Sequence, residues 1–572
     1  MHLLLVLGWG KVCATDESEE SRNMRNGGEL LVQSLVNLGA TKSFGVPGES
    51  YLPVLDALHD TQGQFDFVLC RNEGGASFMA SAYGKLTRTP GICFVTRGPG
   101  ATNASIGVHT AMQDSSPMIL FVGQIGTEMR EREAFQEVDY RAVFGSMVKW
   151  ATEIEHTDRV PELVARAWKV ATSGRPGPVV VALPENTLNG TSEIEPIQGM
   201  RALAEPSPDR ASLADARSLL ERAERPLMIV GGSMISDQNQ RRLERFAEAS
   251  NIPAITAFRY QDCFNHHSPA FCGEAGVGMP PHVQRLIREA DTILAINVRF
   301  GEMTTNAYTL MDVPVPKQKL IHVHGAESEL GKIYVPTIGI QAGPNAFAEA
   351  LEPVQREPDE WSRGARESYE AFLDVKPQPS PVDMASVIQH LRKVLPDDVI
   401  LTNGAGNFTV WSNKFFPLGE KARLLAPQSG AMGYGVPAAI AAKVAHPERP
   451  VICFAGDGDF QMNCQELATA KQAGAQPIIL ILNNGIYGTI RAHQETHFPG
   501  RISGTTMESP DFAMLAQSYG FHGERVARTE DFAAAFERAL ASPTGAVLDL
   551  EISAEAITPS KTLSQIRAEN KS

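Results

Sequence analysis

Short apolar runs alternate with helix-length amphipathic stretches through most of the 572-residue chain. Between residues 24 and 190, the helical period of GELLVQSLVNLG is followed by apolar runs such as FDFVLC, GICFV, PMILFVGQ and GPVVVALPEN. Continuous apolar strands between helices are typical of a parallel sheet that is covered on both faces. The pattern therefore predicts an α/β domain with a doubly wound parallel sheet.

The same alternation recurs twice further along the chain. A second block, 205–352, contains RPLMIVGG, NIPAIT, DTILAINVRF and KLIHVHG, and a third, 383–555, contains VILTNGAGNF, RPVICFAG, QPIILILNN and AVLDLEIS. The polar stretch 187–212 and the stretch 352–382, rich in Pro and charge, are typical of linkers. We therefore expect three consecutive doubly wound parallel-sheet domains.

The two ends of the chain lie outside these blocks. The start, MHLLLVLGWGKVCAT, resembles a weak signal peptide, but no Lys or Arg precedes its short apolar run and Lys11 interrupts the junction. We expect residues 1–23 to be a disordered extension or the product of an early start codon, and 556–572 to be a C-terminal tail.

Composition narrows the function classes. A net charge of −15 argues against nucleic acid or an anionic membrane as a partner. The seven cysteines are scattered without a CxxC pair, which is typical of reduced thiols in the cytoplasm. No apolar segment is long enough to span a bilayer. We therefore expect a cytoplasmic protein without nucleic-acid or membrane partners.

Two turn signals in the third block stand at matched positions. Asp457 follows the strand RPVICFAG, Asn484 follows the strand QPIILILNN, and FQMNCQELATAKQAG between them predicts a helix of about four turns that ends near Gly474. In a right-handed βαβ crossover both strands are parallel, so their carboxyl ends meet at the sheet edge where open α/β sheets bind ligands. Ordinary turn chemistry is the alternative, but it requires no acid and amide at these two ends.

A carboxylate and an amide at one edge suit Mg²⁺ whose remaining ligands are phosphate oxygens and water. Gly458 allows close approach of the backbone, and the helix that follows attracts phosphate at its N-terminus. The loops 402–408 (TNGAGNF) and 429–440 (SGAMGYGVPAAI) add further Gly-rich backbone. Met432 in the second loop would by itself indicate only core packing.

These motifs resemble those of the thiamine-diphosphate-dependent enzymes. GDG followed by NN is similar to their diphosphate–magnesium motif, and GVPGES, RNEGGASFMASAYGKLT, GPGATNAS, SSPMILFVGQ, AFQEVD and VKW resemble the acetolactate synthase-like branch over about 30–555. The resemblance implies pyrimidine-binding, central and diphosphate-binding domains, in that order. It also implies thiamine diphosphate and Mg²⁺ as cofactors, and sites shared between subunits of a homodimer or a dimer of dimers (a homotetramer).

The resemblance assigns a role to individual residues. Glu73 would hydrogen-bond pyrimidine N1′ and, being largely desolvated, support the cofactor as its own base. Met432 would support the bent cofactor, and the Gly430 carbonyl would accept from its amino group. The metal ligands would be Asp457, Asn484 and the main-chain carbonyl of Ile486. The complete cofactor-binding set is Gly404, Ala405, Gly406, Asn407, Gly430, Met432, Gly456, Asp457, Gly458, Asp459, Asn484, Ile486, Tyr487 and Gly488.

The substrate end is less defined. By resemblance, Gln124, Gln136 and Lys149 line the pocket of the acetolactate synthases, and Glu49 stands where a pyruvate-decarboxylating relative uses an acid for proton transfer. RFGEMTTNAY (299–308) replaces the flavin-associated RFDDR-type stretch, which leaves FAD doubtful. His493 replaces a Trp that selects the acceptor in the biosynthetic synthases, and Asp459 stands where Ser is common.

Four functions compete. A carboligase or decarboxylase of small 2-oxo acids, with pyruvate converted to acetolactate and CO₂, is the leading interpretation and makes the protein a transferase or lyase. A lyase that cleaves 2-hydroxy ketones or 2-hydroxyacyl-CoA would use the same cofactor. A nucleotide-binding Rossmann protein would need GxGxxG after a strand, and RGPGATNA lacks it. A catalytically inactive binding protein would not need Glu73, Asp457 and Asn484 together.

Overall fold

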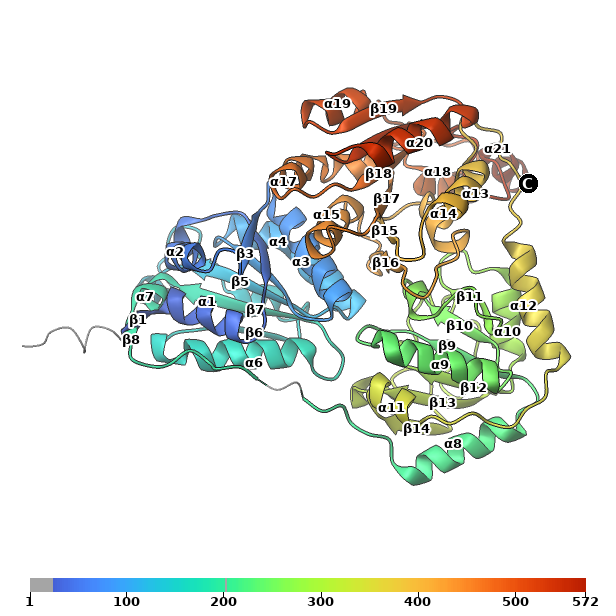
Figure 1. Cartoon of the computed structure of the whole chain (residues 1–572), viewed down its shortest axis with the longest axis horizontal. Helices are drawn as coiled ribbons and strands as arrows, with labels where there is room; N and C mark the ends of the chain where they lie inside the picture. Colours follow the sequence, from blue (N-terminus) through green and yellow to red (C-terminus); the bar gives the residue numbers. More distant parts are fainter. Residues whose placement is uncertain (1–23, 201–202, 572) are drawn as a thin grey trace, which may run out of the picture.

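Three six-stranded sheets, each made only of parallel strand pairs, form the protein in the computed structural model, which describes residues 24–200 and 203–571. Figure 1 shows one sheet in each of three adjoining domains, which follow one another along the chain as N-terminal, central and C-terminal. The predicted α/β class with three doubly wound parallel sheets is confirmed. The predicted extension, 1–23, lies outside the described residues.

The N-terminal sheet is covered by helices on both faces. Along β4, Ile92 and Phe94 face one core cluster whereas Cys93 and Val95 face another, because successive side chains of a strand point to opposite faces. In spatial order its strands are β3 (Asp66–Leu69), β2 (Lys42–Gly45), β4 (Gly91–Val95), β5 (Met118–Gln124), β7 (Pro178–Pro184) and β6 (Trp150–Glu153). Its helices are α1 (Gly27–Asn37), α2 (Leu52–Asp60), α3 (Glu73–Thr87), α4 (Pro99–Asp114), α5 (Tyr140–Phe144), α6 (Val160–Thr172) and α7 (Glu185–Asn189). A short antiparallel pair joins β1 (Arg25–Asn26) to β8 (Thr191–Ser192).

The central sheet has a core of its own. In spatial order its strands are β11 (Phe271–Ala275), β10 (Ala254–Ala257), β9 (Pro226–Val230), β12 (Thr292–Ile296), β13 (Lys319–His324) and β14 (Ile338–Gln341). Its helices are α8 (Arg210–Arg222), α9 (Asp237–Ala249), α10 (Pro281–Glu289) and α11 (Pro344–Ala350).

The stretch 352–382 is not only a linker, and the sequence interpretation was wrong in this respect. It contains α12 (Glu360–Phe372), whose Trp361, Ala365 and Tyr369 pack against the central core. These residues lie four apart on one helix face, a spacing that the Pro-rich and charged flanks obscure. In Figure 1 this helix runs along the outside, between the central and C-terminal domains.

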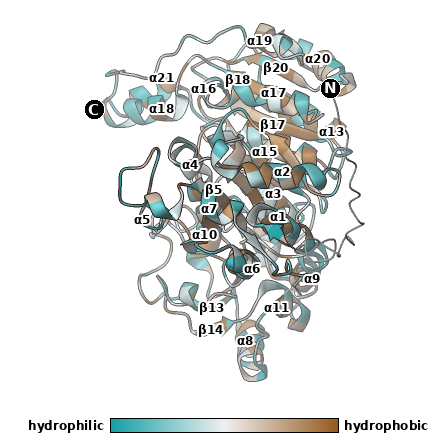
Figure 2. Ribbon diagram, turned by 90° about the vertical axis from the view of Figure 1, so that its left-hand side faces the viewer, coloured by the Kyte–Doolittle hydropathy of each residue, from teal (hydrophilic) through white to brown (hydrophobic). Residues whose placement is uncertain are grey.

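The C-terminal sheet repeats the architecture of the first. In spatial order its strands are β16 (Arg423–Leu425), β15 (Ile400–Asn403), β17 (Val451–Gly456), β18 (Ile478–Asn483), β20 (Ala546–Glu551) and β19 (His522–Val526). Its helices are α13 (Met384–Val394), α14 (Thr409–Lys414), α15 (Gly435–Ala445), α16 (Asp457–Gln461), α17 (Leu467–Gln472), α18 (Gly488–His497), α19 (Phe512–Ser518), α20 (Phe532–Ala541) and α21 (Leu563–Glu569). Figure 2 shows strands of this sheet in the brown of hydrophobic residues.

The predicted four-turn helix between β17 and β18 is broken into α16, a 3₁₀ turn (Cys464–Glu466) and α17. The break coincides with the buried carboxylate of Glu466, which accepts hydrogen bonds from the main-chain NH groups of Arg71 and Asn72 in the N-terminal domain. A tertiary contact therefore overrides the helical period. Gly474 does follow the last helical turn with a positive φ of 68°, as predicted.

The N-terminal and C-terminal domains share one continuous core, in which α3 packs against α15. Phe78 and Tyr434 meet edge to face across this contact, with ring centroids 5.5 Å apart. This shared core therefore fixes the position of the N-terminal sheet relative to the C-terminal sheet. Within the described ranges, no helix combines the length and the apolar character that crossing a membrane requires.

Candidate functional site

The two predicted metal-ligating side chains lie together at the carboxyl edge of the C-terminal sheet. β17 and β18 are neighbouring parallel strands, and Asp457 and Asn484 are the first residues after them. The Asp457 carboxylate is buried and accepts from the main-chain NH groups of Gly458 (2.9 Å) and Gly485 (2.7 Å). Burial raises the pKa of this carboxyl group. The ends of these two strands therefore lie next to each other, as the spacing predicted.

The turn after β18 is fixed by a second segment of the chain. Gly485 has a φ of 66°, which favours glycine. Ile486 forms an isolated antiparallel bridge with Thr506, and the NH groups of Tyr487 and Met507 donate to Thr505 (3.0 Å) and Gly485 (2.8 Å). The main chain of Ile486, predicted as a metal ligand, is therefore held on both sides.

Asp459 joins the three Gly-rich loops of this edge. Its buried carboxylate accepts from the NH groups of Ala405 (3.2 Å) and Gly433 (2.9 Å). A side chain at Gly404 would collide with it, since a Cβ there would lie 2.0 Å from Oδ1. Burial raises the pKa of Asp459 to about 7. Asp459 thus fixes the positions of these loops relative to one another.

These loops enclose a cavity of about 220 Å³. Gly404, which contacts Asp459, does not line this cavity. Every other predicted cofactor-binding residue lines the cavity: Ala405, Gly406, Asn407, Gly430, Met432, Gly456, Asp457, Gly458, Asp459, Asn484, Ile486, Tyr487 and Gly488. The structure therefore brings together residues from three separate stretches of sequence.

The donor set in this cavity fits a Mg²⁺ ion that binds a diphosphate. Within residues 24–200 and 203–571, no group of three or more His, Cys, Asp and Glu could hold a metal by itself. Mg²⁺ does not need such a cage, because it commonly takes one or two carboxylates and completes its octahedron with phosphate oxygens and water. The buried Asp457 carboxylate contacts only main-chain NH groups, and a cation beside it would lower the cost of its burial.

The loop that carries Met432 is attached to both other domains. The NH of Gln428 donates to the buried Asp114 carboxylate of α4 (2.6 Å), which also accepts from Lys85 of α3 (3.2 Å). The Tyr260 hydroxyl of the central domain donates to the main-chain oxygen of Asp114 (2.5 Å). Asp114 is therefore a junction of three domains that sets the position of the loop.

Glu73, the predicted activating acid, is the first residue of α3. It accepts from Asn103 of α4 (2.9 Å), and Asn72 before it caps the helix through Gly74 NH (2.8 Å). Glu73 is only partly buried in the chain. The expectation of a largely desolvated carboxyl group is therefore wrong for the single chain, because the face of α4 beside it, which includes Thr102 and Asn103, is open to solvent.

The other predicted catalytic residues are dispersed over the N-terminal domain. Glu49 is exposed and pairs with Arg97 (3.2 Å). Gln124 is buried. Its side-chain amide donates to Val138 O (2.8 Å) and accepts from Ile125 NH (3.0 Å). Gln136 adopts a φ of 66° directly beside Gly98. These three belong to the carboxyl edge of the sheet, and they do not line the 220 Å³ cavity.

Lys149 lies at the opposite end of the same sheet. Its NH donates to Pro178 O, which pairs with the start of β5, whereas Gln124 at the end of β5 pairs with Pro184. Six residues of strand correspond to about 20 Å. The Lys149 ammonium donates to Val170 O and Ser173 O, and burial lowers its pKa to about 8. In this chain Lys149 is therefore not brought together with the other predicted pocket residues.

A larger cavity of about 1040 Å³ lies between the central and C-terminal domains. It shares Ala405, Gly406, Asn407, Gly430 and Thr489 with the smaller cavity, so the two adjoin.

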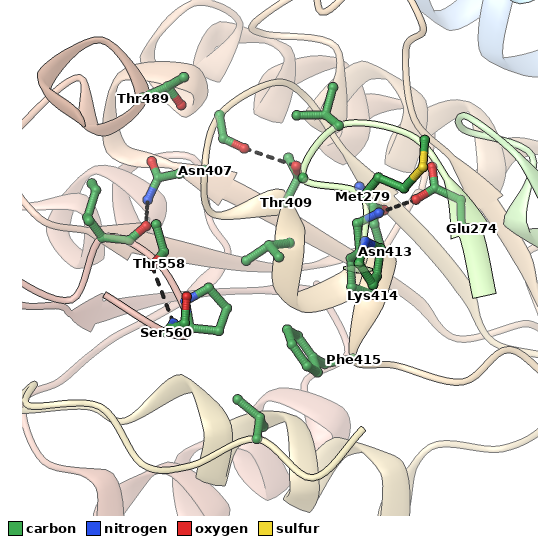
Figure 3. Close-up of a pocket in the computed structure, with 18 of the residues that line it drawn as sticks. Glu274, Met279, Asn407, Thr409, Asn413, Lys414, Phe415, Thr489, Thr558 and Ser560 are labelled. Carbon is green, nitrogen blue, oxygen red and sulfur yellow. Dashed lines mark hydrogen bonds and ion pairs between the residues drawn. The ribbon is translucent and has the colours of Figure 1, made fainter. Parts of the chain in front are cut away.

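The sequence analysis missed several polar and charged residues that line this larger cavity. Figure 3 shows Lys414 paired with Glu274 on one side and Thr558 and Ser560 of the expected C-terminal tail on the other. Arg259, which follows β10, also lines it. No sequence motif marked these residues, since their chemistry depends on a contact between domains.

Comparison with known sequences defines the class of protein. Three family models match: "Thiamine pyrophosphate enzyme, N-terminal TPP binding domain" over 25–143, the central domain over 213–351, and the C-terminal TPP binding domain over 404–550. The chain is therefore a thiamine-pyrophosphate-dependent enzyme. The Rossmann alternative is wrong.

The relatives refine this class. The chain is 30% identical to acetolactate synthase isozyme 2 large subunit of Escherichia coli (strain K12) over 530 residues, 92% of this chain and 95% of that protein. It is 30% identical to isozyme 1 large subunit of the same organism over 549 residues (95% and 96%), and 31% identical to a probable acetolactate synthase large subunit of Methanocaldococcus jannaschii over 549 residues (92% and 92%). The chain belongs to the acetolactate synthase-like thiamine-pyrophosphate enzymes.

Proposed function

We propose that the protein is a thiamine-diphosphate- and Mg²⁺-dependent carboligase or decarboxylase of small 2-oxo acids, with conversion of pyruvate to acetolactate and CO₂ as its leading reaction. The observation that supports it most is the convergence of the predicted cofactor residues on one cavity. The match of the chain to acetolactate synthase large subunits over most of their length supports the substrate class.

When bound, thiamine diphosphate supplies the carbanion-stabilising chemistry that decarboxylation of a 2-oxo acid requires. The residues of this chain bind and orient it. Asp457, Asn484 and the Ile486 carbonyl would hold Mg²⁺ and the diphosphate. Met432 and the Gly430 carbonyl would position the aminopyrimidine, and Glu73 would hold a proton at pyrimidine N1′. The loops fixed by Asp459 would exclude water from the site.

The assembly proposal follows from the separation of the two sheet edges. Glu73, Glu49, Gln124 and Gln136 line neither cavity of their own chain. We therefore propose that the N-terminal edge of a second copy completes each site, in a homodimer or a dimer of dimers. Such an arrangement would also cover the partly exposed Glu73.

Mixing two inactive variants tests the assembly. Glu73→Gln and Asp457→Ala each remove one half of a site. If the halves come from different subunits, a mixed dimer retains one intact site, and random exchange restores about a quarter of wild-type sites. The measurement is activity after joint refolding, with each variant alone as the control. No recovery despite proven subunit exchange would place each site within one chain.

A substrate panel tests the reaction. We expect CO₂ release and acetolactate from pyruvate. The large cavity also has room for a bulkier substrate, so the alternative lyase is tested with benzoin and a 2-hydroxyacyl-CoA, scored by aldehyde release. Aldehyde release without any CO₂ from 2-oxo acids would replace the carboligase proposal with the lyase.

We also propose a cytoplasmic location and the absence of stoichiometric flavin. The six cysteines in the described ranges are free, in keeping with a reducing compartment. The flavin proposal rests on the departure at RFGEMTTNAY (299–308). An absorbance spectrum of the purified protein tests it, and one FAD per chain would refute it.

A further inference from the structure

Arg259 is a buried residue in a strained position. It follows β10 in the central domain, is 5% exposed and has a φ of 63°. A long side chain rarely adopts this left-handed conformation, and such strain persists where the surroundings impose it, often at functional sites. The fold therefore holds the Arg259 side chain in one place.

The Arg259 guanidinium lies over the Phe258 ring (5.1 Å to the centroid) but lacks the hydrogen-bond partners that a buried charge needs. Its single hydrogen bond is a long one, from Nη2 to Thr409 Oγ1 (3.5 Å), and within the described residues Nε and Nη1 are buried with no partner. Burial lowers the pKa of the group to about 10, so it remains a cation at neutral pH. A buried cation without a partner indicates that an anion is missing.

The acidic residues around Arg259 are occupied by other groups. Glu274 pairs with Lys414, and Asp459 accepts from the NH groups of Ala405 and Gly433. Asp114 accepts from Lys85 and Gln428. All three favour the charged form of Arg259 at a distance, but none of them forms an ion pair with it in the described structure, so no carboxylate of the chain hydrogen-bonds its N–H donors.

The space beside Arg259 suits a small carboxylate. Arg259 lines the larger cavity, which adjoins the cofactor cavity through Ala405 and Gly430. Figure 3 shows Thr409, its one hydrogen-bond partner, on this wall, together with the Lys414–Glu274 pair. The wall also contains apolar residues, among them Phe258 and Phe415, which would surround the uncharged part of a substrate.

We propose that Arg259 binds the carboxylate of the 2-oxo acid substrate where the larger cavity meets the cofactor cavity, and so makes the enzyme selective for carboxylates. This inference rests on the proposed function. The planar guanidinium offers a carboxylate two parallel N–H···O bonds, and Nη2, whose only partner is the Thr409 hydroxyl at 3.5 Å, belongs to each such pair of donors.

The test compares a charged substrate with a neutral one. In the Mg²⁺–thiamine diphosphate holoenzyme, Arg259→Gln should raise KM for pyruvate by about 10–100-fold while kcat changes less than about threefold. Methyl pyruvate, which has no carboxylate, should lose nothing. Arg259→Lys keeps the charge without the fork and should recover part of the pyruvate affinity. Arg356→Gln, which removes a buried arginine paired with Asp359 in the same domain, is the matched control.

A binding measurement makes the result independent of turnover. Calorimetric titration with oxamate, a carboxylate that cannot be decarboxylated, should give binding to wild type and to Arg356→Gln and at least about tenfold weaker binding to Arg259→Gln. If wild type turns over no 2-oxo acid but this difference holds, the proposed function fails and the carboxylate site stands.

Three outcomes would overturn the site. The first is wild-type oxamate affinity in Arg259→Gln, the second is no oxamate binding by wild type, and the third is loss of thiamine diphosphate affinity alone, which would assign Arg259 to the cofactor. Thermal unfolding separates a folding defect, because a structural arginine would lower the melting temperature and an unpartnered one would not. Arg259→Lys carries the test if the glutamine variant does not fold.

Discussion

The carboxyl edges of the N-terminal and C-terminal sheets have the same architecture, but the predicted residues behave differently on them. At the C-terminal edge, Asp457, Asn484 and the Gly-rich loops surround one cavity. At the N-terminal edge, Glu73 and Glu49 are partly or largely exposed, and the Gln124 amide is used by main-chain groups. At the C-terminal edge the predicted residues surround a cavity within one chain. At the N-terminal edge the predicted catalytic residues are present, but no cavity of the same chain encloses them.

The difference shows what a strand end determines by itself. Two neighbouring parallel strands necessarily bring the residues after them together, so a binding cradle for a metal and a phosphate can form from one chain. A proton-transferring acid needs a low-polarity environment, and that requires atoms which cover it. The N-terminal edge lacks such a cover in one copy, which is why we propose that a second copy completes it.

The largest expected effect is on cofactor retention at the C-terminal edge. Asp457→Ala or Asn484→Ala removes one of the few protein ligands that Mg²⁺ would have, so retention of thiamine diphosphate at ordinary Mg²⁺ concentration, and with it all activity, should be lost while the fold persists. The measurement is cofactor content after gel filtration, with circular dichroism for the fold. Asp511→Ala, at the N-cap of α19 in the same domain, is the control. Retention by both variants would show that this edge does not hold the metal.

The next effect separates chemistry from binding at the N-terminal edge. In Glu73→Gln, the amide can hydrogen-bond N1′ but cannot hold the proton, so kcat should fall by about 10²–10⁴-fold. Cofactor affinity should change much less, because the proposed diphosphate contacts lie in the other domain. Glu29→Gln, in the first turn of α1, controls for a helix-start carboxylate. Unchanged hydrogen–deuterium exchange at C2 of the bound cofactor would contradict the assignment.

Features that depend on local sequence could be predicted, whereas features that depend on contacts between domains could not. The three sheets and the Asp457–Asn484 pair could be predicted, because strand periodicity and crossover geometry are local properties. The helix after Asp457 could not, since Glu466 breaks it through a contact with Arg71 and Asn72. Arg259 and Lys414 were missed for a similar reason: their contacts join domains that lie far apart in sequence.

A smaller effect concerns the segment expected to be a tail, which extends the C-terminal edge. Glu495 of α18 is buried and paired with Arg567 of α21 (2.5 and 2.8 Å), and this hydrogen bonding lowers the pKa of Glu495 to about 2 from 4.5. A depressed carboxyl pKa stabilises the fold above the unfolded value, and that stability is lost as pH falls from 4.5 toward 2.

We therefore expect hydrogen-exchange protection of α21 to fall between pH 4.5 and pH 2. Arg567→Ala should reduce this protection already at pH 7, by roughly 2 kcal/mol of local opening free energy, since hydrogen bonds to charged groups contribute about that much. Lys561→Ala, which removes an exposed pair with Glu569, is the control and should have little effect. Equal protection of α21 in wild type and Arg567→Ala at pH 7 would show that this pair does not hold the segment.

The smallest effect on activity is expected at Lys149, which tests whether distance along the sheet matters. Lys149 lies at the amino end, where its ammonium is bonded to main-chain carbonyls of α6 and the residue after it. Lys149→Met should therefore change kcat/KM by less than about threefold. A loss comparable to that in Glu73→Gln would mean that assembly brings this end of the sheet to a site.

Lys149 should instead affect stability, in a way that depends on pH. Burial lowers its pKa to about 8 from 10.5, so between these values the unfolded chain binds more protons than the folded one. Stability then rises with pH in this window, and the unfolding free energy of wild type relative to Lys149→Met should shift in favour of wild type by on the order of 2 kcal/mol. Denaturant unfolding of both proteins at pH 7 and pH 9.5 measures this double difference, in which the other titrating groups cancel. A difference that does not change with pH would mean that the Lys149 ammonium is solvated and is not buried under α6.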